Sequence, residues 1–326
     1  MNRGQMKDVA FSVKHAPLHV RAFYGRLIEY LRQELGESMD ILGDEDYDDL
    51  AELEGMYKVV MFCTRGAAIN LTKNCQVTRS FLVDHGPIHT NRAPHGVIDF
   101  EVFSSPYLND RYSADGFRAK VKSWSGGYFL TDHLCSGPIR GGECLVYSIH
   151  NVGWYANSMA EVPFSDDETL DYLRALSKLF KVVHVVSHIN AGGNFVEKYR
   201  DLLPENVLPV AHGFSFMDLI ASVEAVFMEY SSVMAACLWN PEVKLFVRYP
   251  KHVLGPITLQ ARYLHELMES AAYPIVNDMV GDVMALLSSD PKRGKRVEAR
   301  TQIYDLSVED PYYEVLKCVR EAIAMS

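Results

Sequence analysis

A histidine that could transfer a proton lies just after one apolar run of the sequence. The run at residues 81–83 stops at Asp84, His85 and Gly86, and Pro87 follows. Because Gly86 and Pro87 prevent a helix from continuing, His85 is expected on a turn. An imidazole with a pKa near neutral pH could act there as a general base. A purely structural role for His85 is the alternative.

A second stretch ends an apolar run on residues that could bind an anion. Glu229 and Tyr230 close the run, and Ser231 and Ser232 follow directly. The serines are expected to begin a helix over residues 231–238, whose free N–H groups and positive dipole end favour an anion. Their hydroxyls could donate hydrogen bonds to a phosphate. Capping of that helix by the serines is the alternative.

Alternating strands and helices must position these stretches. Apolar runs predict strands, and apolar residues spaced by three and four predict helices. Runs that are apolar nearly throughout are typical of parallel sheets covered on both faces. The strands are expected at 8–13, 57–63, 79–84, 100–105, 144–149, 182–187, 206–210, 225–229 and 243–247, and the helices at 18–35, 165–180, 194–202, 216–222 and 231–238.

This alternation predicts an α/β fold of two doubly wound Rossmann-like domains facing a cleft. A chain of 326 residues also favours two domains over one. Residues 1–135 and 136–300 are the expected domains, joined through a loop-rich connection at 124–143. Residues 301–326 are expected to form a C-terminal helix, which could cross back. Ligands of open α/β sheets bind beyond the carboxyl ends of the strands, where both stretches lie.

The composition indicates which binding partners and which cellular location to expect. A formal net charge of −10 argues against broad nucleic-acid binding, and the basic run at 291–296 is interpreted as a solvated loop before the last helix. No apolar run reaches the roughly 18 residues of a membrane span. The six cysteines include no CxxC pair. We therefore expect buried, reduced thiols and a cytoplasmic protein, which could associate with the inner face of a membrane.

The order of these motifs resembles the CDP-glycerol glycerophosphotransferases, which make teichoic-acid and capsule-like polymers on a GT-B scaffold. The segment from Met228 to Ser232 is similar to the TDYSS motif of that family, with Glu229 in place of the aspartate. His85-Gly86 is similar to its HG motif, and His188-Ile189 to its HP motif. Residues 127–132, GYFLTD, resemble its GYPRxD pattern.

The resemblance implies a role for each matching residue. His85 would be the base and His188 a second catalytic residue, and Gly86 of the HG motif would belong to the donor-binding site. His188, Ser231 and Ser232 would contact the phosphates of the leaving group. Contacts of Glu229 or Tyr230 with the ribose are further expectations.

The resemblance also implies a function. Residues 1–135 would form the acceptor side, and residues 136–300 would bind a nucleotide-activated donor. The expected reaction transfers a glycerophosphate-type or glycosyl group to a hydroxyl acceptor, with no cofactor beyond the donor and no metal. The alternatives are a glycosyltransferase with another acceptor, including a modified nucleic-acid base, a nucleotide-sugar epimerase, and a GT-B-like binding protein without catalysis.

Overall fold

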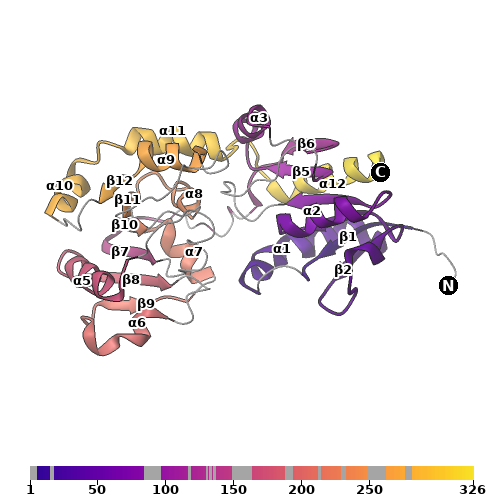
Figure 1. The fold of residues 1–326 in the computed structure, drawn as a ribbon. Coiled ribbons are helices and arrows are strands. Elements are labelled where there is room, and N and C mark those ends of the chain that lie inside the picture. Colours follow the sequence, from indigo (N-terminus) through magenta and orange to yellow (C-terminus); the bar gives the residue numbers. More distant parts are fainter. Residues whose placement is uncertain are drawn as a thin grey trace. The chain divides into compact units, whose positions relative to one another are not determined.

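The chain contains two α/β units, each built around a six-stranded parallel sheet (Figure 1). This computed structural model therefore confirms the predicted pair of Rossmann-like domains. The residues that it describes are 6–14, 18–83, 97–116, 119–129, 131, 134, 137–148, 164–187, 194–211, 214–228, 233–248, 262–275 and 281–326.

The first unit has the strand order β2-β1-β3-β4-β5-β6, with every neighbouring pair parallel. Its strands are β1 (Lys7–Ser12), β2 (Met39–Leu42), β3 (Tyr57–Phe62), β4 (Arg79–Val83), β5 (Phe100–Phe103) and β6 (Lys122–Ser125). Its helices include α1 (Leu18–Leu35), η1 (Gly36–Ser38), η2 (Leu50–Leu53), α2 (Arg65–Asn74), α3 (Pro106–Ala114) and α12 (Pro311–Met325).

Helices cover both faces of the first sheet, which explains its nearly continuous apolar strands. Ala10 and its same-face neighbours in β3 and β4 share a buried cluster with Leu71 of α2. The next residue along β1, Phe11, lies on the opposite face, where its ring contacts Tyr24 of α1 at 5.6 Å. Successive side chains of a strand alternate between faces, so both faces must be apolar.

The second unit has the strand order β12-β11-β10-β7-β8-β9, again with parallel pairs throughout. Its strands are β7 (Arg140–Ser148), β8 (Val182–Ser187), β9 (Val207–Pro209), β10 (Val223–Met228), β11 (Lys244–Arg248) and β12 (Tyr273–Ile275). Its helices include α5 (Asp166–Ser177), α6 (Phe195–Lys198), η4 (Arg200–Leu202), α7 (Phe214–Ile220), α8 (Met234–Cys237), α9 (Arg262–Ala271) and α10 (Gly281–Ser289).

The core of the second unit also lies on both faces of its sheet. Val146 of β7 and Phe227 of β10 pack with Leu173 of α5 in one cluster. On the other face, Tyr147 contacts Phe216 of α7, with ring centroids 5.6 Å apart. Helix α5 begins with a capping box of Ser165 and Glu168.

The C-terminal segment Thr301–Ser326 belongs to the first unit. It includes the last residues of α11 (Arg293–Ile303), and its helix α12 packs on α1, β3 and β5. Ser104 donates a hydrogen bond of 2.7 Å to the carbonyl of Ile303. Trp124 of edge strand β6 donates one of 2.7 Å to Glu321 of α12. The last residues of the chain therefore pack on the first sheet as one of its covering helices.

Three expectations about local structure are wrong. The basic run at 291–296 is not a solvated loop, because α11 begins at Arg293 and Arg296 is fully buried. Its guanidinium pairs with Asp290 at 2.5 Å and donates to the carbonyl of Pro241 at 2.9 Å. The segment 124–143 is not wholly a connection, because β6 and β7 include its two ends.

The third wrong expectation concerns helix lengths in the second unit. Helix α8 is a single turn that begins at Met234, later than the expected start at Ser231. The expected helix at 194–202 is divided at Tyr199 into α6 and η4. A helix of one turn has only a small dipole. An anion at the start of α8 would therefore be bound mainly by the hydroxyl groups of Ser231 and Ser232.

Two further properties concern the described part of the chain. None of its helices combines the length and the apolar character needed to span a bilayer. Its cysteines are buried free thiols: Cys63, Cys75, Cys144, Cys237 and Cys318. Burial raises the pKa of Cys75 and of Cys318 to about 12, so these thiols remain protonated near neutral pH.

Candidate functional site

The site residues predicted from the sequence lie outside the described residues. They are His85, Gly86, His188, Glu229, Tyr230, Ser231 and Ser232. The structure describes the strands that precede them: β4 ends at Val83, β8 at Ser187 and β10 at Met228. Strands β8 and β10 flank β7 in the second sheet, whereas β4 belongs to the first unit.

The end of β4 is fixed by a buried tyrosine. Tyr24 of α1 is fully buried and donates a hydrogen bond of 2.5 Å to the carbonyl of Val83, the last residue of the strand. The ring of Tyr24 also contacts Phe11 and Phe129, with centroids 5.6 and 4.8 Å away. A buried hydrogen bond of this kind holds the strand end, and His85 follows two positions later in the sequence.

A buried ion pair lies in the strand beside β4. Glu101 of β5 is opposite Leu82 in the parallel register. Its carboxylate pairs with Arg65 at 2.9 Å, and the two side chains are only 6% and 11% exposed. Arg65 opens α2, where a cation opposes the helix dipole. The carboxylate offsets that charge and ties the start of α2 to the sheet.

Both ends of the segment that contains His188 are held in the second unit. The backbone N–H of Phe195 donates to the hydroxyl of Ser187 at 2.8 Å, which links the end of β8 to the start of α6. Asn194 caps α6 by accepting from the N–H groups of Val196 and Glu197. His184, in the middle of β8, forms a hydrogen bond of 2.9 Å with Glu143, so it has a structural partner.

A buried arginine marks the end of β11. Arg248 is 2% exposed, and its guanidinium lies 3.3 Å from the ring centroid of Phe164 and 4.6 Å from that of Tyr172. It also donates to the carbonyl of Glu168 at 3.2 Å. Strand β11 pairs with β10. A positive charge is thus held in the strand next to the one that leads to residues 229–232.

The cavity beside Arg248 is small. Its volume of about 10 Å³ is enclosed by residues that include Tyr147, Thr169, Met228 and Arg248. This volume suits about one water molecule and no nucleotide. Arg248 therefore contributes charge and packing to this edge of the sheet rather than the wall of a large pocket.

The described part of the GYFLTD segment has a packing role. Gly127 has a φ of +76°, and a Cβ placed there would lie 2.8 Å from Cγ1 of Val308. Tyr128 is buried and its ring contacts Tyr304 at 5.7 Å. Glycine is thus required where the returning C-terminal segment packs closely on the first unit.

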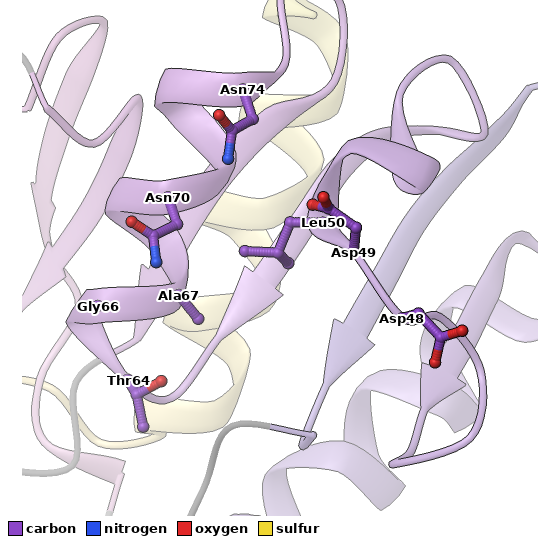
Figure 2. A pocket seen from close by; sticks show the side chains of 8 residues that line it. All are labelled: Asp48, Asp49, Leu50, Thr64, Gly66, Ala67, Asn70 and Asn74. Atoms are coloured by element: carbon purple, nitrogen blue, oxygen red, sulfur yellow. The ribbon is translucent and has the colours of Figure 1, made fainter.

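The first unit contains a pocket of about 560 Å³ at the start of α2 (Figure 2). Asn70 and Asn74 line it from α2, and Asp48 and Asp49 line it from the segment that faces the helix. Thr64, the N-cap residue of α2, also lines it, and its side chain makes no capping hydrogen bond. The volume is in the range of small-molecule sites, about 300–1,000 Å³.

The floor of this pocket is part of the core. Leu50 and Ala67 are 7% and 5% exposed and belong to the cluster between the sheet and α2. Asp49 accepts from the N–H of Ala51 at 3.0 Å in a capping box with Glu52, which fixes the facing segment. A rigid helix and a capped turn therefore form the two walls.

The sequence did not identify these pocket residues because α2 gives a weak signal. Its buried positions are Ala67, Ala68 and Leu71, two of which are too small to produce a clear apolar pattern. The spacing of four between Asn70 and Asn74 would have placed both amides on one face, had the helix been recognised.

No metal centre is found within the described ranges: they contain no group of three or more His, Cys, Asp or Glu side chains arranged to hold an ion. Metal-independent chemistry therefore remains a prediction.

Comparison with known proteins identifies the fold. No protein-family model matches the sequence, and no curated protein matches it significantly. A Listeria monocytogenes protein assigned as a UDP-N-acetylglucosamine 2-epimerase has a TM-score of 0.60 at 12% identity, over 98% of each chain. The wall teichoic acid polymerase TagF has a TM-score of 0.55 at 12% identity, over 98% of this chain and 90% of that chain.

A third similar structure is the spinosyn forosaminyltransferase SpnP, with a TM-score of 0.56 at 11% identity over 98% of this chain and 100% of that chain. These neighbours have the GT-B fold. Identities this low establish the fold alone. The GT-B scaffold that the motifs implied is thus confirmed, whereas the CDP-glycerol family remains a prediction.

Proposed function

We propose that the chain is a transferase that moves a glycerophosphate-type or glycosyl group from a nucleotide-diphosphate donor to a hydroxyl acceptor, in the synthesis of a cell-surface polymer. The observation that carries the proposal is the GT-B fold over 98% of the chain, which it shares with TagF and SpnP. The motif order in the sequence supports the CDP-glycerol-like donor. The acceptor could be a polymer end, a lipid-linked sugar or a modified nucleic-acid base.

The proposed chemistry assigns one task to each unit. His85, after β4, takes the proton of the acceptor hydroxyl as its oxygen attacks. With a CDP-alcohol donor, the new bond forms at the distal phosphorus, the bridging P–O bond breaks, and CMP leaves. With a sugar donor, the new bond forms at the anomeric carbon, the bond from that carbon to the phosphate oxygen breaks, and a nucleoside diphosphate leaves.

The leaving phosphates are assigned to the second unit. His188, Ser231 and Ser232 donate hydrogen bonds to them, and Glu229 or Tyr230 contacts the ribose. Arg248 supports this assignment, because a cation held in the neighbouring strand lowers the cost of bringing negative charge to the edge. These hydrogen-bond donors would stabilise the negative charge of the leaving phosphates without a metal ion. Turnover should therefore persist in the presence of a strong chelator.

A nucleotide-sugar epimerase is the second candidate, because one neighbour with the same fold is assigned that activity. An epimerase needs no acceptor, whereas a transferase does. The candidate residues that follow the strand ends favour transfer, since most of them are imidazoles and hydroxyls. Carboxylates close to the motifs are Asp84, Asp132 and Glu229, and of these Glu229 alone is assigned a contact with the substrate.

A panel of CDP-, UDP- and GDP-activated donors tests the proposal. Each donor is incubated with and without hydroxyl acceptors, and nucleotide release and melting temperature are measured. We expect acceptor-dependent release of CMP from a CDP-alcohol, or of a nucleoside diphosphate from a sugar donor. Epimerised sugar without any acceptor would support the second candidate. A melting shift without turnover, or no response at all, would contradict transfer and favour a binding protein without catalysis.

A further inference from the structure

The pocket of Figure 2 has a chemistry that differs from that of a phosphate site. The lining includes two carboxylate residues, Asp48 and Asp49, and two amide residues, Asn70 and Asn74; in Figure 2 the side chain of Asp49 lies toward α2, and that of Asp48 points away from the helix. Carboxylates only accept hydrogen bonds, whereas each amide both donates and accepts. A group with several neighbouring hydroxyls can satisfy both kinds of partner at once, because each hydroxyl donates one bond and accepts others.

The charge of the walls argues against an anionic ligand. Among the residues that the structure describes, eight line the pocket and none of these is basic. Arg65, beside Thr64 and Gly66 in the sequence, is paired with Glu101, and Lys73 of the same helix does not line the pocket. Two unit negative charges at the surface disfavour a phosphate by Coulomb repulsion, even though the start of α2 by itself would favour one. The preferred ligand is therefore neutral.

The floor of the pocket suits the less polar face of the same kind of ligand. Leu50 and Ala67 are almost fully buried beneath the polar walls. A sugar ring or polyol chain presents C–H groups as well as hydroxyls, and apolar contact with such a floor adds to hydrogen bonding at the rim. Space remains at the mouth, where a Cβ on Gly66 would meet no described atom within 4 Å.

The pocket also lies at the edge of the sheet where the proposed base follows. Thr64 comes two residues after β3 ends at Phe62, and Phe62 pairs with Leu82 of β4. His85 is three positions beyond Leu82 in the sequence. From the polarity, charge and position of this pocket, we infer that it binds a neutral, hydroxyl-rich group, a sugar or a polyol. This inference rests on the proposed function only in naming that group as part of the acceptor.

The inference is tested by binding without any nucleotide. Glucose and sorbitol serve as neutral probes, their 6-phosphates as anionic probes, and saturation-transfer NMR measures the dissociation constants. We expect the neutral probes to bind with Kd values in the millimolar range and more tightly than the phosphates at low salt. Absence of binding by both neutral probes would overturn the inference.

Variants locate the binding. Asn70→Ala with Asn74→Ala should weaken the neutral probes about tenfold, the scale of one or two lost hydrogen bonds. Alanine is the better helix former at these exposed positions, so α2 should remain folded. Lys73→Ala is the matched control, because Lys73 is exposed on the same helix and does not line the pocket. Equal affinity in the double variant and the control would overturn the inference.

Two further variants test the shape and the charge of the pocket. Gly66→Gln should block the mouth and abolish binding, since its side chain enters open space at a helical position. Asp48→Asn with Asp49→Asn should bring the affinity for the phosphates close to that for the neutral probes, and asparagine can replace the Asp49 cap. An unchanged preference would refute the charge argument.

The outcome is separable from that of the proposed function. Sugar or polyol binding without turnover of any donor would leave the site standing and reject the transferase. Turnover with a donor, but no binding of either neutral probe, would leave the transferase standing and reject the site. Unaltered acceptor KM in the Asn70 and Asn74 double variant would reject the assignment of the bound group to the acceptor.

Discussion

At the scale of single residues, the account depends most on His85. The structure explains why its substitution should leave the fold intact: Tyr24 holds the carbonyl of Val83 at 2.5 Å, and that bond involves no atom of His85. The strand end is therefore fixed by buried groups that precede the turn. Function at His85 can be tested without a large cost in stability.

His85→Ala is expected to lower turnover by about 10²–10⁴, the usual contribution of a general base. Donor affinity should stay nearly the same, and the wild-type rate should depend on an ionisation near neutral pH that the variant lacks. Kinetics across pH, donor titration and thermal melting measure these quantities. A variant with near-normal turnover, or one that unfolds, would show that His85 is structural, and His188 would be the next candidate.

At the scale of elements, one carboxylate anchors the turn before β4. Glu54 accepts hydrogen bonds from the N–H groups of Gln76, Val77 and Thr78 at 2.9, 2.9 and 3.1 Å. Burial alone would raise the pKa of Glu54, but these bonds outweigh it and hold the pKa below the ordinary 4.5. The ionised form is thus stabilised in the folded state, and the turn depends on it.

Glu54→Gln is expected to lower the free energy of unfolding by about 1–2 kcal/mol at neutral pH, because charge-assisted hydrogen bonds are lost. A depressed folded pKa contributes stability above the unfolded pKa, and that stability is lost as the pH falls below about 4.5. The difference in the free energy of unfolding between the variant and the wild type should therefore become smaller at acid pH. Urea unfolding at a series of pH values measures it. Glu29→Gln, at an exposed position of α1, is the control; a gap independent of pH would contradict the account.

The bounds of individual strands show which elements the sequence could predict. Strands such as β3 and β10 are buried on both faces, so their long apolar runs gave nearly correct bounds. Edge strands gave weaker signals: β6 is polar, and β12 contains Pro274, which an edge position tolerates. Arg296 was misjudged because a basic run gives no sign that Asp290 will bury one of its members.

At the scale of the whole molecule, alternation of strands and helices predicted two Rossmann-like domains, and similar structures support the GT-B scaffold. The pocket could not be predicted, because one of its walls is α2, whose small buried alanines give too weak a pattern for the helix to be recognised. The motifs after β4, β8 and β10 were visible because each directly follows a strong apolar run. Local patterns thus indicated candidate residues, whereas the shape of a site required the fold.

The central claim is that the second unit binds the nucleotide-diphosphate donor of a transferase. A structure of the chain with the nucleotide selected by the donor panel tests it most directly. The account predicts that the phosphates lie within hydrogen-bond reach of residues 229–233, beyond the end of β10. Phosphates bound beyond contact range of those residues would contradict the claim.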